Sequence, residues 1–452
     1  MTAQLETIAR SAFDAATRSL DAGRAMERHV TAHRGLLVVD RYTIDVASRG
    51  DIRVAAFGKA ADRMAEALAE QFDRSGVDRA ALRGVIVAHT DGVSPISWCE
   101  RIVGGHPVPT EASFAAGRRL LRLFDGCTER TLAIFLVSGG GSALVEAPRD
   151  ASVTDDDIVG LNRALLRSDL TIREMNAIRK RVSAIKGGGL AAHARPAEQL
   201  TLIVSDVSPG EIATVASGPT VADDTTIEEL RSAVRRIDGR PGVTPAVMRV
   251  LEDSVRTEIP TARDALATGP VVTLLDCRDA AASAAVEVGR VADEVVNLDV
   301  VDGPLESVID AHLTALERAI AVAPGRLVGV VSSGEVTLDV TGDGVGGRNQ
   351  HSVLYALARV GALCPSASEI AILSAGTDGR DGPTDAAGAV AGLETLAGAA
   401  ASGVSIGEYL GRCDSHTFFE RCGGLIVTGA TGTNVRDIRI VLGRSEPVSS
   451  AL

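Results

Sequence analysis

The chain has 452 residues, of which 45% are hydrophobic, 23% charged and 3% aromatic, and its formal net charge is −13. Because domains usually hold about 100 to 200 residues, this length predicts two domains, and an acidic chain without a basic run argues against nucleic-acid partners. No apolar run reaches the ~18 residues of a membrane span, and charges at Glu6, Arg10 and Asp14 argue against a signal peptide, so we expect a cytoplasmic protein.

The first predicted element is an amphipathic helix from Gln4 to Val30, where apolar residues recur at helical spacing. From residue 52 onward, short apolar runs such as IRVAAFG, TLAIFLVSG and LTLIVSD end in glycine, serine or aspartate. Such runs, separated by helical segments, are typical of parallel strands that are buried on both faces. We therefore expect residues 1–247 to form a doubly wound, Rossmann-like α/β/α sandwich.

The composition then shifts toward Asp, Arg, Thr and Pro between about residues 222 and 270, and RIDGRPGVTP (236–245) is the candidate linker. Beyond it, PVVTLLD, LVGVVSSG, IAILSAG, GGLIVTG and IRIVLG predict the strands of a second α/β domain over residues 248–452. Polar and apolar residues alternate in EVTLDVT (335–341), which predicts a strand with one solvated face. The second sheet should therefore be mixed.

Polar residues and glycine loops follow the predicted strands at their carboxyl ends, where open α/β sheets bind ligands. GKAA places Lys59 at a strand-to-helix turn, and SDVSPGE places Asp206 after a later strand. SGGGS offers backbone amides that could cradle an anion, contributed by Ser138, Gly139, Gly140, Gly141 and Ser142. Lys186 stands before a second triple glycine and is a candidate to reach the same region.

The segment VTGDGVGGRNQH contains Gly342, Gly344 and Gly347 in the G-x-G-x-x-G spacing of a dinucleotide-binding turn. Such a turn should follow a continuously apolar strand and should have an acid after the next strand, about 20 residues on. Here the preceding strand alternates, and Glu369 comes before the next strand. We interpret the loop as leading into Arg348 and a helix start, a combination that favours an anion.

The loop GTDGRDGPTDAAG carries Asp378, Asp381 and Asp385, which do not have the spacing of an EF-hand. Aspartates in glycine turns often cap their own backbone. Three carboxylates at a strand end could instead hold Mg²⁺ together with water molecules. Both interpretations remain open at this point.

Eight segments in order along the chain resemble the motifs of the type 2 glycerate kinases, whose C-terminal part is called the MOFRL domain. They are AFGKAA, GGHPVPT, LVSGGGSAL, IKGGGLA, SDVSPGEIATVASGPT, GDGVGGRNQ, AGTDGRDGPTDAAGA and TGATGTNVRDI. The resemblance covers nearly the whole chain and implies a MOFRL region of about residues 325–443. It implies an ATP- and Mg²⁺-dependent kinase that phosphorylates the 2-hydroxyl of D-glycerate to give 2-phosphoglycerate, in a cleft between two α/β domains.

Lys59 and Arg348 match residues that are regarded as essential in that family, and Asp206 is the third candidate catalytic residue. The candidate substrate- and phosphate-binding residues are Ser138, Gly139, Gly140, Gly141, Ser142, His106, Lys186, Glu335, Gly347, Asn349, Thr377, Asp378 and Asn434. The candidate metal ligands are Asp378, Asp381 and Asp385. The expected partners are small molecules, D-glycerate and ATP, and a homodimer is left open.

The chain departs from the family pattern near SSGE, at Gly424 and at Ala430, which leaves the substrate preference open among short hydroxy acids such as erythronate and threonate. Relatives are often labelled hydroxypyruvate reductases, so an NAD(P)H-dependent reductase is the alternative enzyme class. A ligand-binding or scaffold protein is the third class, and it predicts no turnover.

Overall fold

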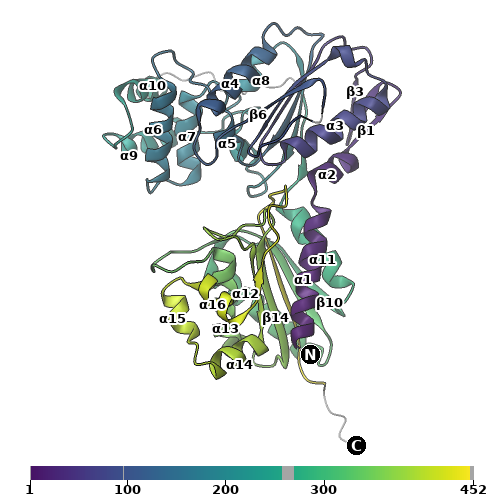
Figure 1. Ribbon diagram of the computed structural model, residues 1–452, viewed down its shortest axis with the longest axis vertical. Helices are drawn as coiled ribbons and strands as arrows, with labels where there is room; N and C mark the ends of the chain where they lie inside the picture. Colours follow the sequence, from purple (N-terminus) through teal and green to yellow (C-terminus); the bar gives the residue numbers. More distant parts are fainter. Residues whose placement is uncertain (1, 95, 257–268, 448–452) are drawn as a thin grey trace, which may run out of the picture. The chain divides into compact units, whose positions relative to one another are not determined.

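The computed structural model describes residues 2–94, 96–256 and 269–447, and these form two compact units (Figure 1). One unit, Ala22–Leu274, contains Lys59 and is called the Lys59 unit. The other combines the chain up to Asp21 with the chain from Leu275 onward and is called the Arg348 unit. The chain thus changes unit at Leu275, whereas the sequence predicted a boundary between residues 247 and 248.

The candidate linker lies inside the Lys59 unit. Residues 236–245 cover the turn between α9 (Ile227–Ile237) and α10 (Pro245–Arg256), and apolar side chains of both helices belong to one core cluster. Its glycines and prolines therefore end one helix and begin the next, which is a local role that such residues also serve. The prediction of an interdomain linker at this position was wrong.

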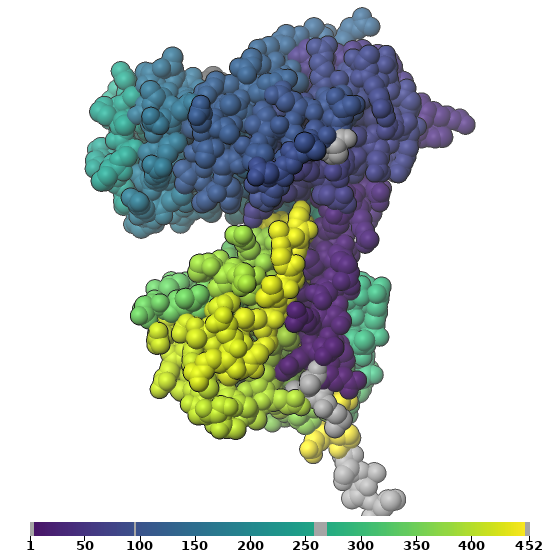
Figure 2. Space-filling view, viewed as in Figure 1, coloured from purple at the N-terminus to yellow at the C-terminus, as the bar shows by residue number. Residues whose placement is uncertain are grey.

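The predicted opening helix is divided into α1 (Thr2–Ser19) and α2 (Ala22–His29). Helix α1 packs against α11, β14, β15 and β17 of the Arg348 unit, whereas α2 contacts α3 of the Lys59 unit. Figure 2 shows α1, in purple, on the surface of the unit that contains the C-terminal strand. Apolar spacing continues through both helices, so periodicity alone did not reveal that the chain passes between units at this point.

The Lys59 unit contains a six-stranded sheet in the order β6-β5-β4-β7-β8-β9. Strand β4 pairs in parallel with β5 on one side and with β7 on the other, and the pairs β5–β6 and β7–β8 are also parallel. Every residue of β4 and β7 is buried, which confirms the interpretation of continuous apolar runs as two-faced strands. The strands are β4 (Ile52–Phe57), β5 (Leu82–Ala88), β6 (Cys99–Val103), β7 (Leu132–Ser138), β8 (Glu198–Val204) and β9 (Val271–Leu275).

Helices α3 and α4 contact this sheet, while α6, α7, α9 and α10 contribute to a separate apolar cluster. The helices not yet bounded are α3 (Ala61–Ser75), α4 (Glu111–Phe124), α5 (Gly141–Leu144), α6 (Asp155–Leu166), α7 (Ile172–Val182) and α8 (Gly189–His193), with 3-10 turns η1 (Arg79–Ala81) and η2 (Ile212–Ser217). A small antiparallel sheet consists of β1 (Val30–His33), β2 (Leu36–Val39) and β3 (Tyr42–Asp45).

The Arg348 unit contains a mixed sheet in the order β10-β12-β17-β14-β15-β16, which confirms the predicted mixed character. β10 and β12 are parallel, whereas β17 lies antiparallel between β12 and β14. Residues 335–341 do not form the predicted solvated strand, because only β13 (Val336–Thr337) is extended there and it pairs with β11 (Gly303–Pro304). The sheet strands are β10 (Glu294–Val300), β12 (Val328–Gly334), β14 (Glu369–Gly376), β15 (Gly388–Gly392), β16 (Leu425–Ile426) and β17 (Asp437–Arg444).

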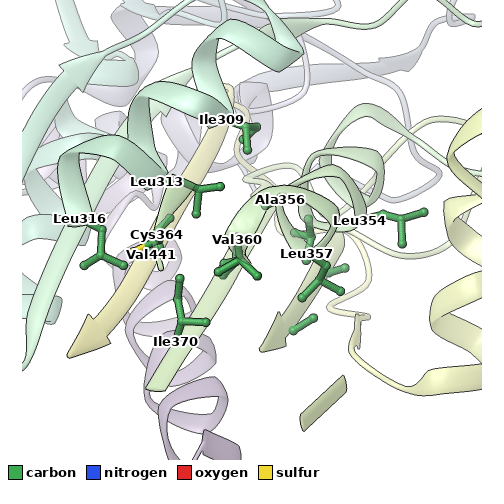
Figure 3. Close-up of a cluster of buried hydrophobic side chains, with 14 of the residues drawn as sticks. Ile309, Leu313, Leu316, Leu354, Ala356, Leu357, Val360, Cys364, Ile370 and Val441 are labelled. Carbon is green, nitrogen blue, oxygen red and sulfur yellow. The ribbon is translucent and has the colours of Figure 1, made fainter. Parts of the chain in front are cut away.

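Helices lie on both sides of this sheet, with α1 and α11 on one side and α12 and α13 on the other (Figure 1). Side chains of α12 and α13 meet Ile370 of β14 and Val441 of β17 in a buried apolar cluster (Figure 3). The remaining helices are α11 (Cys277–Gly289), α12 (Leu305–Val322), α13 (Arg348–Leu363), α14 (Leu393–Ala401), α15 (Ile406–Gly411) and α16 (Ser415–Cys422). None of the helices in the described ranges has the length and apolar character needed to cross a membrane.

A buried histidine links α12 to β12 in this core. His312 Nδ1 lies 2.6 Å from the Val308 carbonyl oxygen, and Nε2 lies 2.7 Å from Ser332 Oγ. Burial and the positive charge of Arg439 lower the pKa of His312 from 6.5 to about 4. The imidazole is therefore neutral in the native protein at neutral pH.

We predict that acid destabilises the protein through His312. The unfolded chain binds a proton near pH 6.5 and the native chain only near pH 4, so stability present above pH 6.5 is lost as the pH falls toward 4. Between pH 7 and 5 the loss should be about 2 kcal/mol. Urea unfolding at several pH values should show this loss in the wild type and a flatter profile in His312→Gln. Identical profiles for the two proteins would contradict the prediction.

Candidate functional site

The turns that follow β4 and β7 are joined by hydrogen bonds. Lys59 N donates to the Gly139 carbonyl oxygen at 2.9 Å, and Ala60 N donates to Ser138 Oγ at 3.0 Å. Gly58 has φ +119°, and a Cβ atom there would lie 2.2 Å from Ser138 Oγ, so only glycine permits this approach. The two strands are neighbours at which the strand order reverses, the place where doubly wound sheets bind their ligands.

Three of the predicted site residues surround the glycine loop at this position. Gly140 has φ +83°, and a Cβ atom there would lie 3.4 Å from both Lys59 Cγ and His106 Cδ2. A Cβ atom on Gly139 would lie 2.0 Å from Asp206 Oδ2, so the Asp206 carboxylate packs on bare backbone. The structure thus gathers Lys59, His106 and Asp206 around Gly139 and Gly140, and we call these five residues the Lys59 cluster.

The electrostatics of the cluster favour a neutral histidine. Desolvation, followed by the nearby Lys59 and His89, lowers the pKa of His106. A neutral imidazole can accept a proton or a hydrogen bond. His89 follows β5 directly and was not among the sequence candidates, although it stands at a strand end in VIVAH as Lys59 and Asp206 do elsewhere.

Other candidates of the Lys59 unit are engaged in its interior. Ser142 Oγ lies 2.8 Å from Ser217 Oγ, which donates to Asn176 Oδ1 at 2.9 Å. Gly141 packs against Phe57 and Ala216. Packing and this chain of hydrogen bonds therefore support the second half of the loop that follows β7.

Lys186 has a different position from the one predicted. Its side chain is 1% exposed and forms an ion pair with Glu146, which also accepts a hydrogen bond from Ser183 Oγ at 2.5 Å. Desolvation lowers the pKa of Lys186. A buried carboxylate requires a paired cation, so the structure gives Lys186 a structural partner in place of the predicted anion.

In the Arg348 unit, the guanidinium of Arg348 is bound by two carboxylates. Nε and Nη2 donate to the two oxygens of Asp437 at 2.7 and 3.0 Å, and Nη1 lies 2.7 Å from Glu335 Oε1. Burial disfavours the cation, but Asp437 and Glu335 outweigh that effect and raise the pKa of Arg348. Arg348 is therefore permanently charged and held in a fixed bidentate geometry.

The position of Asp437 follows from the sheet. Asp437 begins β17 and is paired with Gly334 of β12 on one side and with Gly376 of β14 on the other. Because β17 is antiparallel to both neighbours, its first residue lies at their carboxyl ends. Sequence reasoning missed Asp437 and Arg436, although both lie in the segment TGATGTNVRDI; the available signal was an Arg-Asp pair between a glycine loop and a strand.

The start of α13 is capped by Asp381. One carboxylate oxygen accepts from Asn349 N at 3.0 Å, and the other accepts from Gln350 N at 2.8 Å. A Cβ atom on Gly347 would lie 2.2 Å from the Asp381 carboxyl carbon. Burial raises the pKa of Asp381 to about 6 against the effect of these hydrogen bonds. The amides expected to attract a ligand anion therefore bind an internal carboxylate, which corrects that part of the sequence interpretation.

Several predicted binding residues support this region from inside. Asn349 is buried and accepts from Ser374 Oγ at 2.6 Å. Thr377 is buried, donates to the Arg436 carbonyl oxygen at 2.7 Å and accepts from Val435 N. Asn434 Oδ1 accepts from Arg436 N at 3.3 Å. These contacts shape the loop that carries Arg436 and Asp437.

The three aspartates proposed as metal ligands do not form a metal site. Among the residues that the structure describes, no group of three or more His, Cys, Asp or Glu side chains is arranged to hold a metal ion. Asp381 caps α13, Asp378 Oδ1 accepts from Arg380 N at 3.1 Å, and Asp385 is exposed. The capping interpretation of Asp381 and the turn interpretation of Asp378 are the ones that the contacts support.

The G-x-G-x-x-G spacing has a packing explanation. Cβ atoms on Gly342 and Gly344 would lie 2.2 and 2.4 Å from atoms of Arg412 and Asp414. No sheet strand leads into this loop, since β13 ends at Thr337, and the α13 amides that would hold a pyrophosphate bind Asp381. A dinucleotide turn requires both features, so the loop does not fit one.

Comparison with known proteins gives two family matches and similar relatives. Residues 8–252 match the family described as Domain of unknown function (DUF4147), and residues 328–437 match the MOFRL family. A Thermotoga maritima protein named D-glycerate 2-kinase is 33% identical over 86% of this chain and 90% of its own length. An Agrobacterium vitis protein provisionally named hydroxypyruvate reductase is 38% identical over 86% of this chain and 98% of its own.

A solved structure extends the similarity to the fold. The crystal structure described as Glycerate kinase from Thermotoga maritima covers 97% of this chain and 99% of its own, with a TM-score of 0.78 and 28% identity. The α/β architecture of both units is therefore shared over almost the full length.

We predict that Asp381 and Asp385 differ sharply in their effect on stability. Asp381→Ala leaves buried donors at the start of α13 without an acceptor, so it should lower the free energy of unfolding by about 2 kcal/mol. Asp385→Ala removes an exposed carboxylate and should change it by less than about 0.5 kcal/mol. Urea unfolding at pH 7.5 measures both. Equal destabilisation by the two variants would contradict the capping role.

Proposed function

We propose, from the premise that the chain belongs to the glycerate kinase family, that it transfers the γ-phosphoryl group of ATP to the 2-hydroxyl of D-glycerate. The products are 2-phosphoglycerate, ADP and a proton. The observation that carries the proposal is the Lys59 cluster, which places a cation, a glycine loop and two proton acceptors at the switch point of a doubly wound sheet. The 2-position is supported by the name of the Thermotoga relative.

Phosphoryl transfer needs chiefly positioning and positive charge, because the transferred group spreads negative charge over its equatorial oxygens. Lys59 would supply a compact charge on a flexible stem, and the Gly139–Gly140 backbone permits close approach of a phosphate. Arg348 would supply a second, rigidly oriented charge. Lys59 and Arg348 are therefore the two cations that we assign to the proposed reaction.

The hydroxyl proton must be accepted as the new O–P bond forms. We propose Asp206 for this role, because its carboxylate packs on Gly139 beside Lys59. His106, whose pKa is lowered, would accept a hydrogen bond from the substrate as a neutral imidazole. Neither role requires a residue from outside the Lys59 unit.

We propose that Mg²⁺ binds together with ATP. Mg²⁺ in nucleotide sites is held mainly by phosphates and water, with one or two protein carboxylates. Among the sequence candidates, Asp378 is the carboxylate that we assign to it. Bound there, the ion would neutralise phosphate charge. ATP as the donor and a cytoplasmic location belong to the same proposal.

We predict that the purified protein with ATP and D-glycerate forms a product that enolase dehydrates directly, because enolase acts on 2-phosphoglycerate. The assay is phosphoenolpyruvate formation with and without added phosphoglycerate mutase. A requirement for the mutase would show phosphorylation at the 3-position. Oxidation of NADH with hydroxypyruvate, without ADP formation from D-glycerate, would support the reductase alternative and contradict the proposal. Parallel reactions with erythronate and threonate define the preferred acid.

We predict that Lys59→Met lowers kcat by on the order of 10³, because the charge near the transferred phosphoryl group is lost. Arg74→Met is the matched control, since Arg74 is an exposed cation at the far end of α3, the helix that follows Lys59. Its kcat should stay within about twofold of wild type. Steady-state ADP release measures both variants. Similar losses in both, or none in Lys59→Met, would contradict the role of Lys59.

A further inference from the structure

Glu335 bridges two arginines at the carboxyl end of β12. Its Oε1 lies 2.7 Å from Arg348 Nη1, and its Oε2 lies 3.5 Å from Arg436 Nη2. The Glu335 side chain is 41% exposed. A single carboxylate thus spans two guanidinium groups and faces solvent at the same time. We call Arg348 and Arg436, with the space that Glu335 fills between them, the two-arginine site.

Both guanidinium groups are oriented by carboxylates other than that of Glu335. Asp437, which is 1% exposed, binds Arg348 through two hydrogen bonds. Asp302 binds Arg436 Nη1 at 2.9 Å and also accepts from the Glu335 backbone N at 2.7 Å. The backbone contact fixes Asp302 in place. If the Glu335 carboxylate moved away, the two arginines would therefore keep their positions.

Glu335 supplies part of the negative charge that surrounds these arginines. Arg348, Arg436 and Arg439 interact with four acids, Asp437, Asp302, Glu335 and Asp381. Arg439 is buried and donates to Ser332 Oγ and to the carbonyl oxygens of Val301 and Ser333. Departure of the Glu335 carboxylate would remove the carboxylate that both guanidinium groups share at a partly exposed position, and two neighbouring cations there attract another anion.

We propose that Glu335 is an internal occupant of this two-arginine site and that the carboxylate of the hydroxy-acid substrate displaces it. The resident group is itself a carboxylate bound by two guanidinium groups, so a ligand carboxylate matches it in charge and shape. In this proposal Arg436 is a second substrate-binding arginine. Glu335 does not bind the substrate but competes with it for the two arginines. The identity of the acid as D-glycerate rests on the proposed function.

The test measures binding of D-glycerate without ATP by isothermal titration calorimetry. Glu335→Gln removes the competing charge and should tighten binding by about threefold to tenfold. Arg436→Gln removes one of the two cations and should weaken binding by about tenfold or more. Glu408→Gln, at an exposed position on α15, is the matched control and should bind as the wild type does. Circular dichroism and thermal unfolding confirm that each variant is folded.

Unchanged or weaker binding of D-glycerate to Glu335→Gln would overturn the inference. Inorganic phosphate provides a second arm: if phosphate binds more tightly to Glu335→Gln and D-glycerate does not, the carboxylate assignment is wrong. D-lactate separates the inference from the proposed function, because it carries the carboxylate and a 2-hydroxyl without the third carbon's hydroxyl. Tighter D-lactate and D-glycerate binding by Glu335→Gln, in a protein that phosphorylates neither acid, would support the site and contradict the kinase proposal.

Discussion

The hydrogen bond from Lys59 N to the Gly139 carbonyl oxygen joins the ends of the two central strands, and the candidate site is organised around it. Two neighbouring parallel strands must end at the same level for this bond to form, and Gly58 must lack a side chain so that the turns can touch. Because β4 and β7 are apolar along their whole length, both strands are buried in the sheet core, and the core fixes where each strand ends. The sheet core thus determines where the lysine, the histidine and Asp206 meet.

The Arg348 unit places several charged side chains close together in its interior, and each of them needs a partner of opposite charge or a hydrogen bond. Asp381 satisfies the amides at the start of α13, and Asp437 fixes the orientation of Arg348. Because Asp381 already binds the amides at the start of α13, we expect a ligand anion to bind to guanidinium groups and not to the start of this helix. The exposed Glu335 carboxylate lies within ion-pair distance of both Arg348 and Arg436.

Glycines with the same local appearance serve two unlike purposes in this chain. Gly58 and Gly140 have positive φ values and let backbone and polar side chains meet at a turn. Gly342 and Gly344 make room for a neighbouring segment near Arg412. A spacing pattern cannot separate these cases, since the neighbour that requires the glycine lies far away along the chain. Of the two features that argued against a dinucleotide turn, the position of Glu369 is confirmed, since it begins β14, whereas the strand expected before the glycines is limited to Val336–Thr337.

By itself, the sequence determined the class of each sheet, because apolar periodicity is a local property that short segments carry. It also identified the family, through the eight motifs that resemble those of the glycerate kinases. The tertiary structure decided which polar residues pair with one another. Arg348 and Asp437 are 89 residues apart, Lys186 and Glu146 are 40 apart, and Asn349 and Asp381 are 32 apart. It also assigned α1 to the Arg348 unit. Such pairings depend on how whole elements pack, and burial then gives residues such as Lys186 and Asp381 structural partners inside the protein.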